Sequence, residues 1–291
     1  MSETPLDRPP ESPESPDAAA SPPAAPTPSR AGLVLRSVGS VIAGAAKGAA
    51  QGASAAWHAV DPDLRRPLGE LPLLGLTMLQ SRRPPPVRLP DDGHRPLVFV
   101  HGLGGHRGNF LPMRLFFRLQ GRTRTYSVGF EPHAGLDQLA AQLGAYLDEV
   151  ARVNGLGESG QVDLVAHSMG GIVARLALED LSVRSRVRTL LTLGTPHAGT
   201  HAARYAATAF TLALRPGSEV LERLAQQAPW TAPPRLVCFW SRSDVLLLPP
   251  ETACVQGAEC VELAGLTHYG YLLQPACFRR AFEALREERE R

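Results

Sequence analysis

The chain has 291 residues, of which 44% are hydrophobic, and its formal net charge is +2 at pH 7. This length and composition allow one substantial buried core. A charge so close to neutral gives no electrostatic reason to expect a nucleic-acid partner. No run of about 18 uncharged apolar residues occurs, so no membrane-spanning helix is predicted.

The first 30 residues are rich in Pro, Ser and Ala and contain almost no large apolar side chains. Such a segment cannot bury enough surface to offset the entropy of ordering it, so we predict a disordered leader over 1–30. It carries neither the basic region nor the apolar region of a secretory signal. We therefore expect a cytoplasmic protein.

Residues 31–93 differ in composition and form a second predicted segment. Glycines recur every fourth position in an Ala-rich stretch, which predicts a helix within 31–60, and a proline-rich connector then follows. Small residues at this spacing let a helix lie close to another backbone or to a bilayer surface. Arg36 and Lys47 interrupt the stripe, which favours a helix covering the domain over peripheral contact with a membrane.

From residue 94 onward, short apolar runs alternate with helical patterns, and we predict one catalytic domain over 94–291. Strands are predicted over 97–100, 123–130, 162–166, 187–193, 236–240 and 261–263. Helices are predicted over 109–120, 136–150, 169–181, 202–214, 218–227 and 277–290. This alternation predicts an α/β fold with a mainly parallel sheet of about six strands and helices on both faces.

About forty residues separate the strand ending near 193 from the strand beginning at 236. A connection of this length in a compact domain is usually functional, so we predict a helical lid over about 198–234. Five large apolar side chains could form its underside. They are Tyr205, Phe210, Leu212, Leu214 and Trp230.

Ser168 stands between a predicted strand and a predicted helix, with Ala166 and Gly170 close on either side. A sharp strand-to-helix turn brings backbones together, so small neighbours are needed. The turn also lifts the serine hydroxyl clear of the sheet at the positive end of the helix. The pattern predicts a nucleophile elbow, with alanine in place of the first glycine of G-x-S-x-G.

A serine hydroxyl needs a base to remove its proton, and that base needs an anion to orient it. Asp244 and His268 each follow a later strand, which gives the chain order serine, acid, histidine. We therefore predict Ser168 as nucleophile, His268 as general base and Asp244 as its partner. Glu251 is a rival acid farther from its strand end, and the alternative reading makes Asp244 a loop cap and His268 a turn residue.

The negative oxygen of a tetrahedral intermediate must also be bound. The backbone N–H groups of Leu103, in the glycine loop after the first strand, and of Met169, directly after the nucleophile, are the predicted oxyanion-hole donors. His101 and His167 flank the site, and we expect them to hydrogen-bond and order the backbone.

Three other features of the sequence bear on possible chemistry. His197 and His201 stand four apart, but Gly199 between them argues for a loop, so neither a metal nor a cofactor is predicted. Arg175 is expected to form a structural ion pair. The cysteines show no metal or redox spacing, although Cys254 and Cys260 could pair in an oxidising compartment.

Taken together, the runs His101–Gly105, Ala166–Gly171 and Gly194–Gly199 resemble the bacterial triacylglycerol lipase/esterase family of the α/β-hydrolase superfamily. Relatives of this family include deacylases that act on lipid anchors. The resemblance covers roughly residues 94–280 and implies hydrolysis of carboxylic esters with acyl chains by the predicted triad. Some members bind a structural calcium or zinc, for which no ligand set can be mapped here.

The sequence thus predicts a lipase or carboxylesterase that acts on a small-molecule ester or lipid through an acyl-enzyme on Ser168. Two alternatives stay open. The same residues could serve an acyltransferase or a thioesterase, or the fold could bind lipids or a partner without catalysis. Acyl-chain length depends on how the lid folds, which the sequence does not determine.

Overall fold

The computed structural model describes residues 69–70, 85–131 and 133–286. The predicted leader (1–30) and the predicted Ala/Gly-rich helix (31–60) lie outside the described residues, as does much of the connector. The domain boundaries at 30 and 93 therefore stay predictions.

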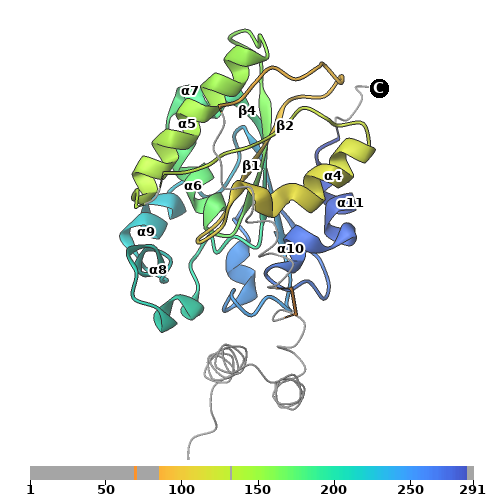
Figure 1. Ribbon diagram of the computed structural model, residues 1–291. Coiled ribbons are helices and arrows are strands. Elements are labelled where there is room, and N and C mark those ends of the chain that lie inside the picture. Colours follow the sequence, from red (N-terminus) through yellow and green to blue (C-terminus); the bar gives the residue numbers. More distant parts are fainter. Residues whose placement is uncertain (1–68, 71–84, 132, 287–291) are drawn as a thin grey trace, which may run out of the picture.

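A six-stranded parallel sheet forms the centre of the molecule (Figure 1). Its strand order is β2-β1-β3-β4-β5-β6, so the chain adds β2 on one side of β1 and then builds outward on the other side. Every pair of neighbouring strands is parallel, which confirms the predicted fold class. The strands are β1 Leu97–Val100, β2 Thr125–Ser127, β3 Val162–His167, β4 Val187–Leu193, β5 Arg235–Trp240 and β6 Glu259–Glu262.

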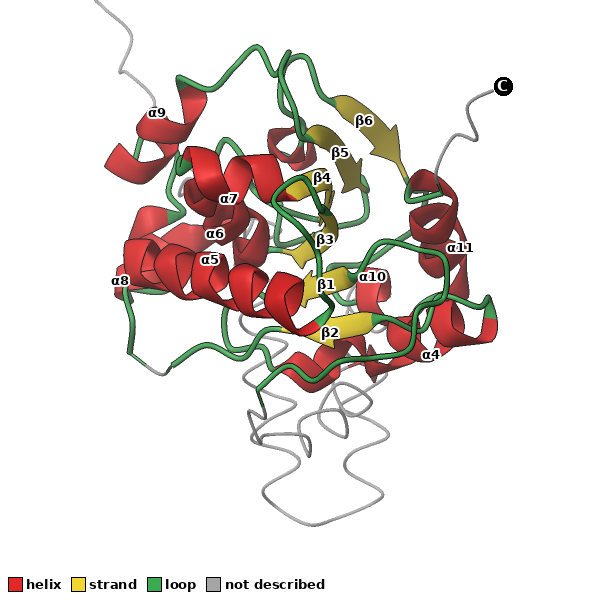
Figure 2. Ribbon diagram, turned by 90° about the horizontal axis from the view of Figure 1, so that it is seen from above, coloured by secondary structure: helices red, strands yellow, loops and turns green. Residues whose placement is uncertain are grey.

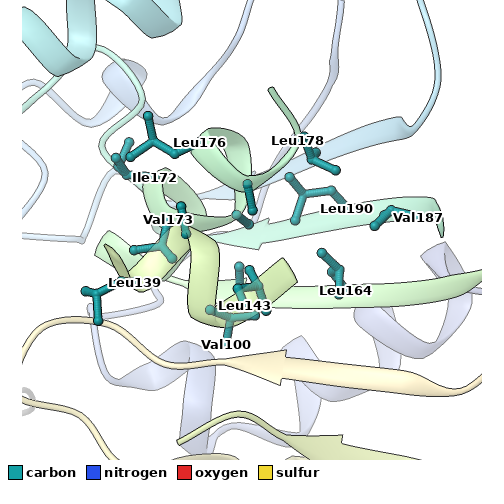
Figure 3. Close-up of a cluster of buried hydrophobic side chains, with 14 of the residues drawn as sticks. Val100, Leu139, Leu143, Leu164, Ile172, Val173, Leu176, Leu178, Val187 and Leu190 are labelled. Carbon is teal, nitrogen blue, oxygen red and sulfur yellow. The ribbon is translucent and has the colours of Figure 1, made fainter. Parts of the chain in front are cut away.

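Helices cover both faces of this sheet (Figure 2). Successive side chains of a strand point to opposite faces, so Val98 and Val100 join one apolar cluster and Leu97 and Phe99 join another. The first cluster includes α5 (Leu136–Val153) and α6 (Met169–Ala177), and part of it is drawn in Figure 3. The second includes α4 (Leu111–Leu119) and α11 (Pro275–Ala284). Each fully buried aliphatic side chain contributes roughly 1.5–3 kcal/mol.

The long helix α5 shows the pattern that the sequence predicted. Its core-facing side chains recur every three or four residues, and its exposed positions are Asp137, Gln138, Ala141, Ala145, Asp148 and Arg152. The buried positions are Leu139, Ala140, Leu143, Gly144, Leu147, Val150 and Ala151.

The other helical elements between residues 85 and 286 are short. They are η1 Arg107–Phe110, α7 Leu181–Arg186, η2 His201–Tyr205, α8 Ala209–Ala213, α9 Glu219–Ala225, η3 Pro250–Ala253 and α10 Gly270–Leu273. Within the described ranges, no helix combines the length and the apolar character needed to cross a membrane.

The elbow helix was predicted to reach about Leu181, but α6 ends at Ala177. The reason is local, because the carboxylate of Asp180 accepts a hydrogen bond from the backbone N–H of Ser182 (2.8 Å) and so caps a separate helix, α7. Leu181 is consequently exposed rather than part of the core.

Two strands and the last helix also differ from their predicted limits. β2 begins two residues later than expected, because the backbone N–H groups of Thr123 and Arg124 donate to the carboxylate of Asp92 instead. β6 begins earlier, since Glu259 already pairs with β5. The last helix ends at Ala284 rather than near 290.

Candidate active site

Ser168 forms the one-residue corner between β3 and α6. Its backbone angles, φ 55° and ψ −130°, lie in a region that costs a non-glycine residue about 1–3 kcal/mol. The surroundings offset this strain, because the Ser168 N–H donates to the Leu193 carbonyl (2.9 Å) and the Ser168 carbonyl accepts from Thr195 Oγ1 (2.9 Å). The strand, corner and helix follow the arrangement predicted for a nucleophile elbow.

Small residues surround the corner for steric reasons. A Cβ added at Gly170 would lie 2.6 Å from the Val100 carbonyl oxygen, and one added at Gly102 would lie 2.8 Å from Ser168 Cβ. Ala166 is fully buried. The need for small residues at 166 and 170 was expected from the turn, whereas the contact made by Gly102 arises only when the loop after β1 folds over the elbow.

The imidazole of His268 lies between Ser168 and Asp244. The distance from His268 Nε2 to Ser168 Oγ is 2.9 Å, and that from His268 Nδ1 to Asp244 Oδ2 is 2.8 Å. Asp244 is 1% exposed and His268 is 6% exposed, so both hydrogen bonds are largely removed from water. The rival acid, Glu251, is exposed in η3. The structure thus brings together the three residues that the sequence selected from separate loops.

A buried serine connects the acid loop to the histidine loop. Ser241 Oγ accepts from the backbone N–H of Ser243 (3.2 Å) and from that of Leu266 (3.1 Å), and Ser241 is fully buried. These bonds position Asp244 and His268 relative to each other. The sequence analysis did not predict a role for Ser241. Its position directly after β5 and three residues before Asp244 could have indicated one.

His167 contacts the backbone of His268, in agreement with the backbone-ordering role predicted for it. His167 Nε2 lies 2.9 Å from the carbonyl oxygen of His268, and because a carbonyl only accepts, this nitrogen carries the proton. Burial, together with the nearby His268, lowers the pKa of His167 to about 3. His167 is therefore neutral near pH 7 and acts as a donor of fixed orientation.

A cavity of about 240 Å³ lies beside the loop after β1, and both Leu103 and Met169 line it. Leu103 is 44% exposed, whereas Met169 is buried as the first residue of α6. The first N–H groups of a helix have no partner within that helix, so the one at Met169 can serve a ligand. The two predicted oxyanion donors thus belong to residues that share one cavity, and their role stays a prediction.

The predicted lid region packs in part against the domain. Leu214 and Trp230 are buried and Phe210 lines the cavity, whereas Tyr205 and Leu212 are about half exposed. The predicted apolar underside is therefore divided between the core, the cavity and the surface. Whether this region moves as a lid stays a prediction.

Arg175 in α6 forms hydrogen bonds that connect the predicted lid region (about 198–234) to the rest of the domain. Its guanidinium donates to the Leu224 carbonyl (2.5 Å) and to Gln227 Oε1 (3.3 Å), and it lies 3.4 Å from His197 Nδ1. Burial lowers the pKa of Arg175 to about 10, so it stays charged near pH 7. Arg175 was expected to form an ion pair; instead, among the described residues, it satisfies neutral oxygens and forms no ion pair with an Asp or Glu.

The two histidines that stand four apart, His197 and His201, have different surroundings. His197 is buried with its Nε2 3.1 Å from Thr192 Oγ1, whereas His201 is exposed in η2. In the part of the chain that is described, no group of three or more His, Cys, Asp or Glu side chains is placed to hold a metal ion.

Cys254 and Cys260, considered as a disulfide pair, are both free thiols, as are Cys238 and Cys277. Cys260 is exposed on β6 and its register partner on β5 is the buried Cys238. Hydrogen bonds from the Cys238 and Cys254 thiols lower the pKa of Cys260. The three sulfur atoms thus form a small cluster at the sheet edge, away from the triad.

The fold and the site together define a class of protein. The chain has the α/β-hydrolase fold, with a serine, a histidine and an aspartate joined at the carboxyl ends of the parallel strands. Residues 143–213, which run from the middle of α5 to the end of α8 and include Ser168, match the family model described as the PGAP1-like alpha/beta domain.

Solved structures of lipases share this fold. Mature lipase BlEst2 of Bacillus licheniformis superimposes with a TM-score of 0.57 at 19% identity, over 69% of this chain and 96% of that one. Lipase B of Aspergillus fumigatus superimposes with a TM-score of 0.57 at 18% identity, over 70% of this chain and 55% of the fungal one. The gene lin2722 product of Listeria innocua gives a TM-score of 0.51 at 14% identity, over 67% of this chain and 96% of that one. The fold expected from the motifs is confirmed.

Proposed function

We propose that this chain is a serine hydrolase that cleaves carboxylic esters of lipids through an acyl-enzyme on Ser168. The observation that carries the proposal is the chain of two hydrogen bonds from Ser168 Oγ through His268 to Asp244 Oδ2. It occurs at the corner between β3 and α6, where Ser168 is partly exposed. The lipase structures with the same fold agree with an ester substrate.

In the proposed reaction, His268 Nε2 takes the proton of Ser168 Oγ as the oxygen attacks the ester carbonyl. Asp244 stabilises the imidazolium that forms, and the backbone N–H groups of Leu103 and Met169 receive the oxyanion. His268 then gives the proton to the departing alcohol, which leaves the acyl group on Ser168. Water, activated by the same histidine, releases the acid.

The cavity supports a substrate with an apolar part. Phe130, Leu139 and Phe210 contribute apolar walls beside the proposed oxyanion donors, while His106 and Arg107 add polar ones. An ester carrying both an acyl chain and a polar group would match this mixed lining. We therefore propose medium or long acyl chains as the preferred substrates.

The test has two readouts. Labelling with a fluorophosphonate reports a nucleophilic serine, and hydrolysis of p-nitrophenyl esters from two to sixteen carbons reports acyl preference. Ser168→Ala should abolish labelling and lower kcat by at least about 10³-fold. Ser185→Ala, a surface serine on α7, is the matched control and should change neither.

The outcomes separate the alternatives. Labelling without hydrolysis, but with acyl transfer to an added alcohol, would favour an acyltransferase, and faster turnover of acyl thioesters would favour a thioesterase. A rate that falls steadily beyond short chains would leave a small-ester esterase. Absence of labelling in the wild type would contradict the acyl-enzyme and favour a non-catalytic binding fold.

A further inference from the structure

Glu70 lies well before the first strand, in the segment that the sequence assigned to a connector, yet its side chain is inserted into the hydrolase domain. It is only 9% exposed. Figure 1 shows this short segment, orange in the colour bar, close to α10. A buried carboxylate needs hydrogen-bond donors, and its two donors among the described residues, Thr267 and Gln274, come from the loop that carries His268.

The two oxygens of Glu70 hold the two ends of that loop. Thr267 Oγ1 donates to Glu70 Oε2, and Gln274 Nε2 donates to Glu70 Oε1 (3.4 Å). Thr267 directly precedes His268, and Gln274 ends the short helix α10 that begins two residues after it. One carboxylate thus spans the turn from which the catalytic imidazole extends.

Bonds within the turn transmit this restraint to the backbone. Thr267 Oγ1, while donating to Glu70, also accepts from the backbone N–H of Gly270 (2.9 Å). A Cβ added at Gly270 would lie 2.8 Å from Gln274 Nε2 and 3.0 Å from Thr267 Oγ1, so the turn is packed tightly around the two donors of Glu70.

We propose that Glu70 is a positioning residue for the catalytic histidine, so that a segment preceding the hydrolase sheet completes the active site. This inference depends on the proposed function of Ser168 and His268. Glu70 touches neither the substrate nor the reacting atoms. It acts through Thr267 on the direction of the His268 ring, which must stay within hydrogen-bond reach of Ser168 Oγ.

Four variants test the proposal in the full-length protein. Glu70→Ala removes both acceptor oxygens, whereas Glu70→Gln keeps one acceptor for Thr267. Thr267→Val removes the hydroxyl at nearly constant shape, and Thr267→Ser keeps it. Glu149→Ala is the matched control, because Glu149 is a surface carboxylate whose side-chain partner is Arg152 on the same helix.

A misplacement of about 1 Å in a catalytic group can cost on the order of 100-fold in rate. We expect Glu70→Ala and Thr267→Val each to lower kcat and the rate of fluorophosphonate labelling by about 10- to 100-fold, at temperatures well below unfolding and with little change in KM. Glu70→Gln and Thr267→Ser should stay within about threefold of the wild type. The double variant Glu70→Ala/Thr267→Val should be no slower than the slower single variant.

Hydrogen exchange of the peptide spanning residues 265–274 gives a readout independent of activity, and it should rise in Glu70→Ala but not in Glu149→Ala. If the wild type is inactive and unlabelled, the proposed function fails, and this exchange difference still decides whether Glu70 restrains the loop. If Glu70→Ala and Thr267→Val lower only the unfolding temperature while kcat and labelling are unchanged, Glu70 merely fastens its own segment and the proposal is overturned. If Glu70→Ala does not fold, the comparison of Thr267→Val with Thr267→Ser decides.

Discussion

Replacing Gly102 by alanine tests whether the loop after β1 must lie directly against Ser168. The added Cβ would stand 2.8 Å from Ser168 Cβ and 2.9 Å from the His167 carbonyl oxygen. Carbon atoms pack best about 3.5–4.0 Å apart, so the loop or the elbow must move by about 0.7 Å or more. Both neighbours lie at the corner between β3 and α6, where Ser168 is hydrogen-bonded to Leu193 and Thr195, and we therefore expect the loop to move.

Leu103 is the next residue of that loop, so its backbone N–H moves with it. Loss of one oxyanion donor costs about 3 kcal/mol, which corresponds to about 100-fold in kcat. We expect Gly102→Ala to lower kcat on a p-nitrophenyl ester by 10- to 100-fold (order-of-magnitude estimate), with the unfolding free energy reduced by about 1–3 kcal/mol through overpacking. Steady-state kinetics and urea unfolding measure the two effects separately.

Gly157→Ala provides the control, because a Cβ at Gly157 meets nothing within 4 Å. This variant should match the wild type in rate and stability. If Gly102→Ala kept kcat within about threefold of the wild type, the loop would not carry an oxyanion donor as proposed, and the steric reasoning would be refuted.

Three further predictions concern stability and thiol chemistry. Arg175→Met should lower the free energy of unfolding by about 1.5–3 kcal/mol in urea titrations, because the hydrogen bonds from the buried guanidinium to the Leu224 carbonyl (2.5 Å) and to Gln227 Oε1 (3.3 Å) are lost. The pKa of His167 is lower in the folded protein than in the unfolded chain, so between about pH 6.5 and pH 3 only the unfolded chain binds a proton at this residue. The free energy of unfolding therefore falls by up to about 1.4 kcal/mol for each pH unit below about pH 6.5. Cys260 should be alkylated by iodoacetamide at neutral pH faster than the buried Cys277, because hydrogen-bonded thiols stabilise its thiolate.

Each of these predictions has a control and a contradicting result. Arg188→Met, an exposed arginine on β4, should leave stability unchanged, and an equal loss in both arginine variants would contradict the role of burial. His167→Gln should show a shallower loss of unfolding temperature below pH 6.5, and an unchanged slope would assign the acid sensitivity to other groups. Mass spectrometry that finds Cys277 modified first would overturn the proposed thiol order.

Local patterns in the sequence were sufficient to predict the architecture of the sheet and its helices. The all-apolar run 97–100 predicted a buried strand, and the alternation of strands with helices predicted a parallel sheet covered on both faces; the sheet is parallel throughout. The face of α5 was readable because an amphipathic helix repeats its apolar positions every three or four residues. Helix ends were less predictable, as the cap at Asp180 shows, because one side-chain hydrogen bond decides where a helix stops.

The candidate triad could also be predicted from the sequence, because each member follows a strand and the carboxyl ends of parallel strands lie at the same edge of the sheet. The contacts that surround the triad could not be predicted in the same way. The bonds made by Ser241, the contact of Gly102 with the elbow, and the buried environment of Arg175 all join segments far apart in the chain. No local sequence pattern predicts such contacts, because they depend on how the loops pack over the sheet.

By itself, the sequence determined an α/β sheet, a strained serine corner, and the order in which serine, acid and histidine follow their strands. These are properties of hydrophobic periodicity and of turn chemistry, which act over a few neighbouring residues. Only the tertiary structure decided that His268 Nε2 lies 2.9 Å from Ser168 Oγ and that Glu70 contacts the loop that carries His268. The physical reason is that hydrogen bonds between distant residues form only after the burial of apolar surface has brought their elements together.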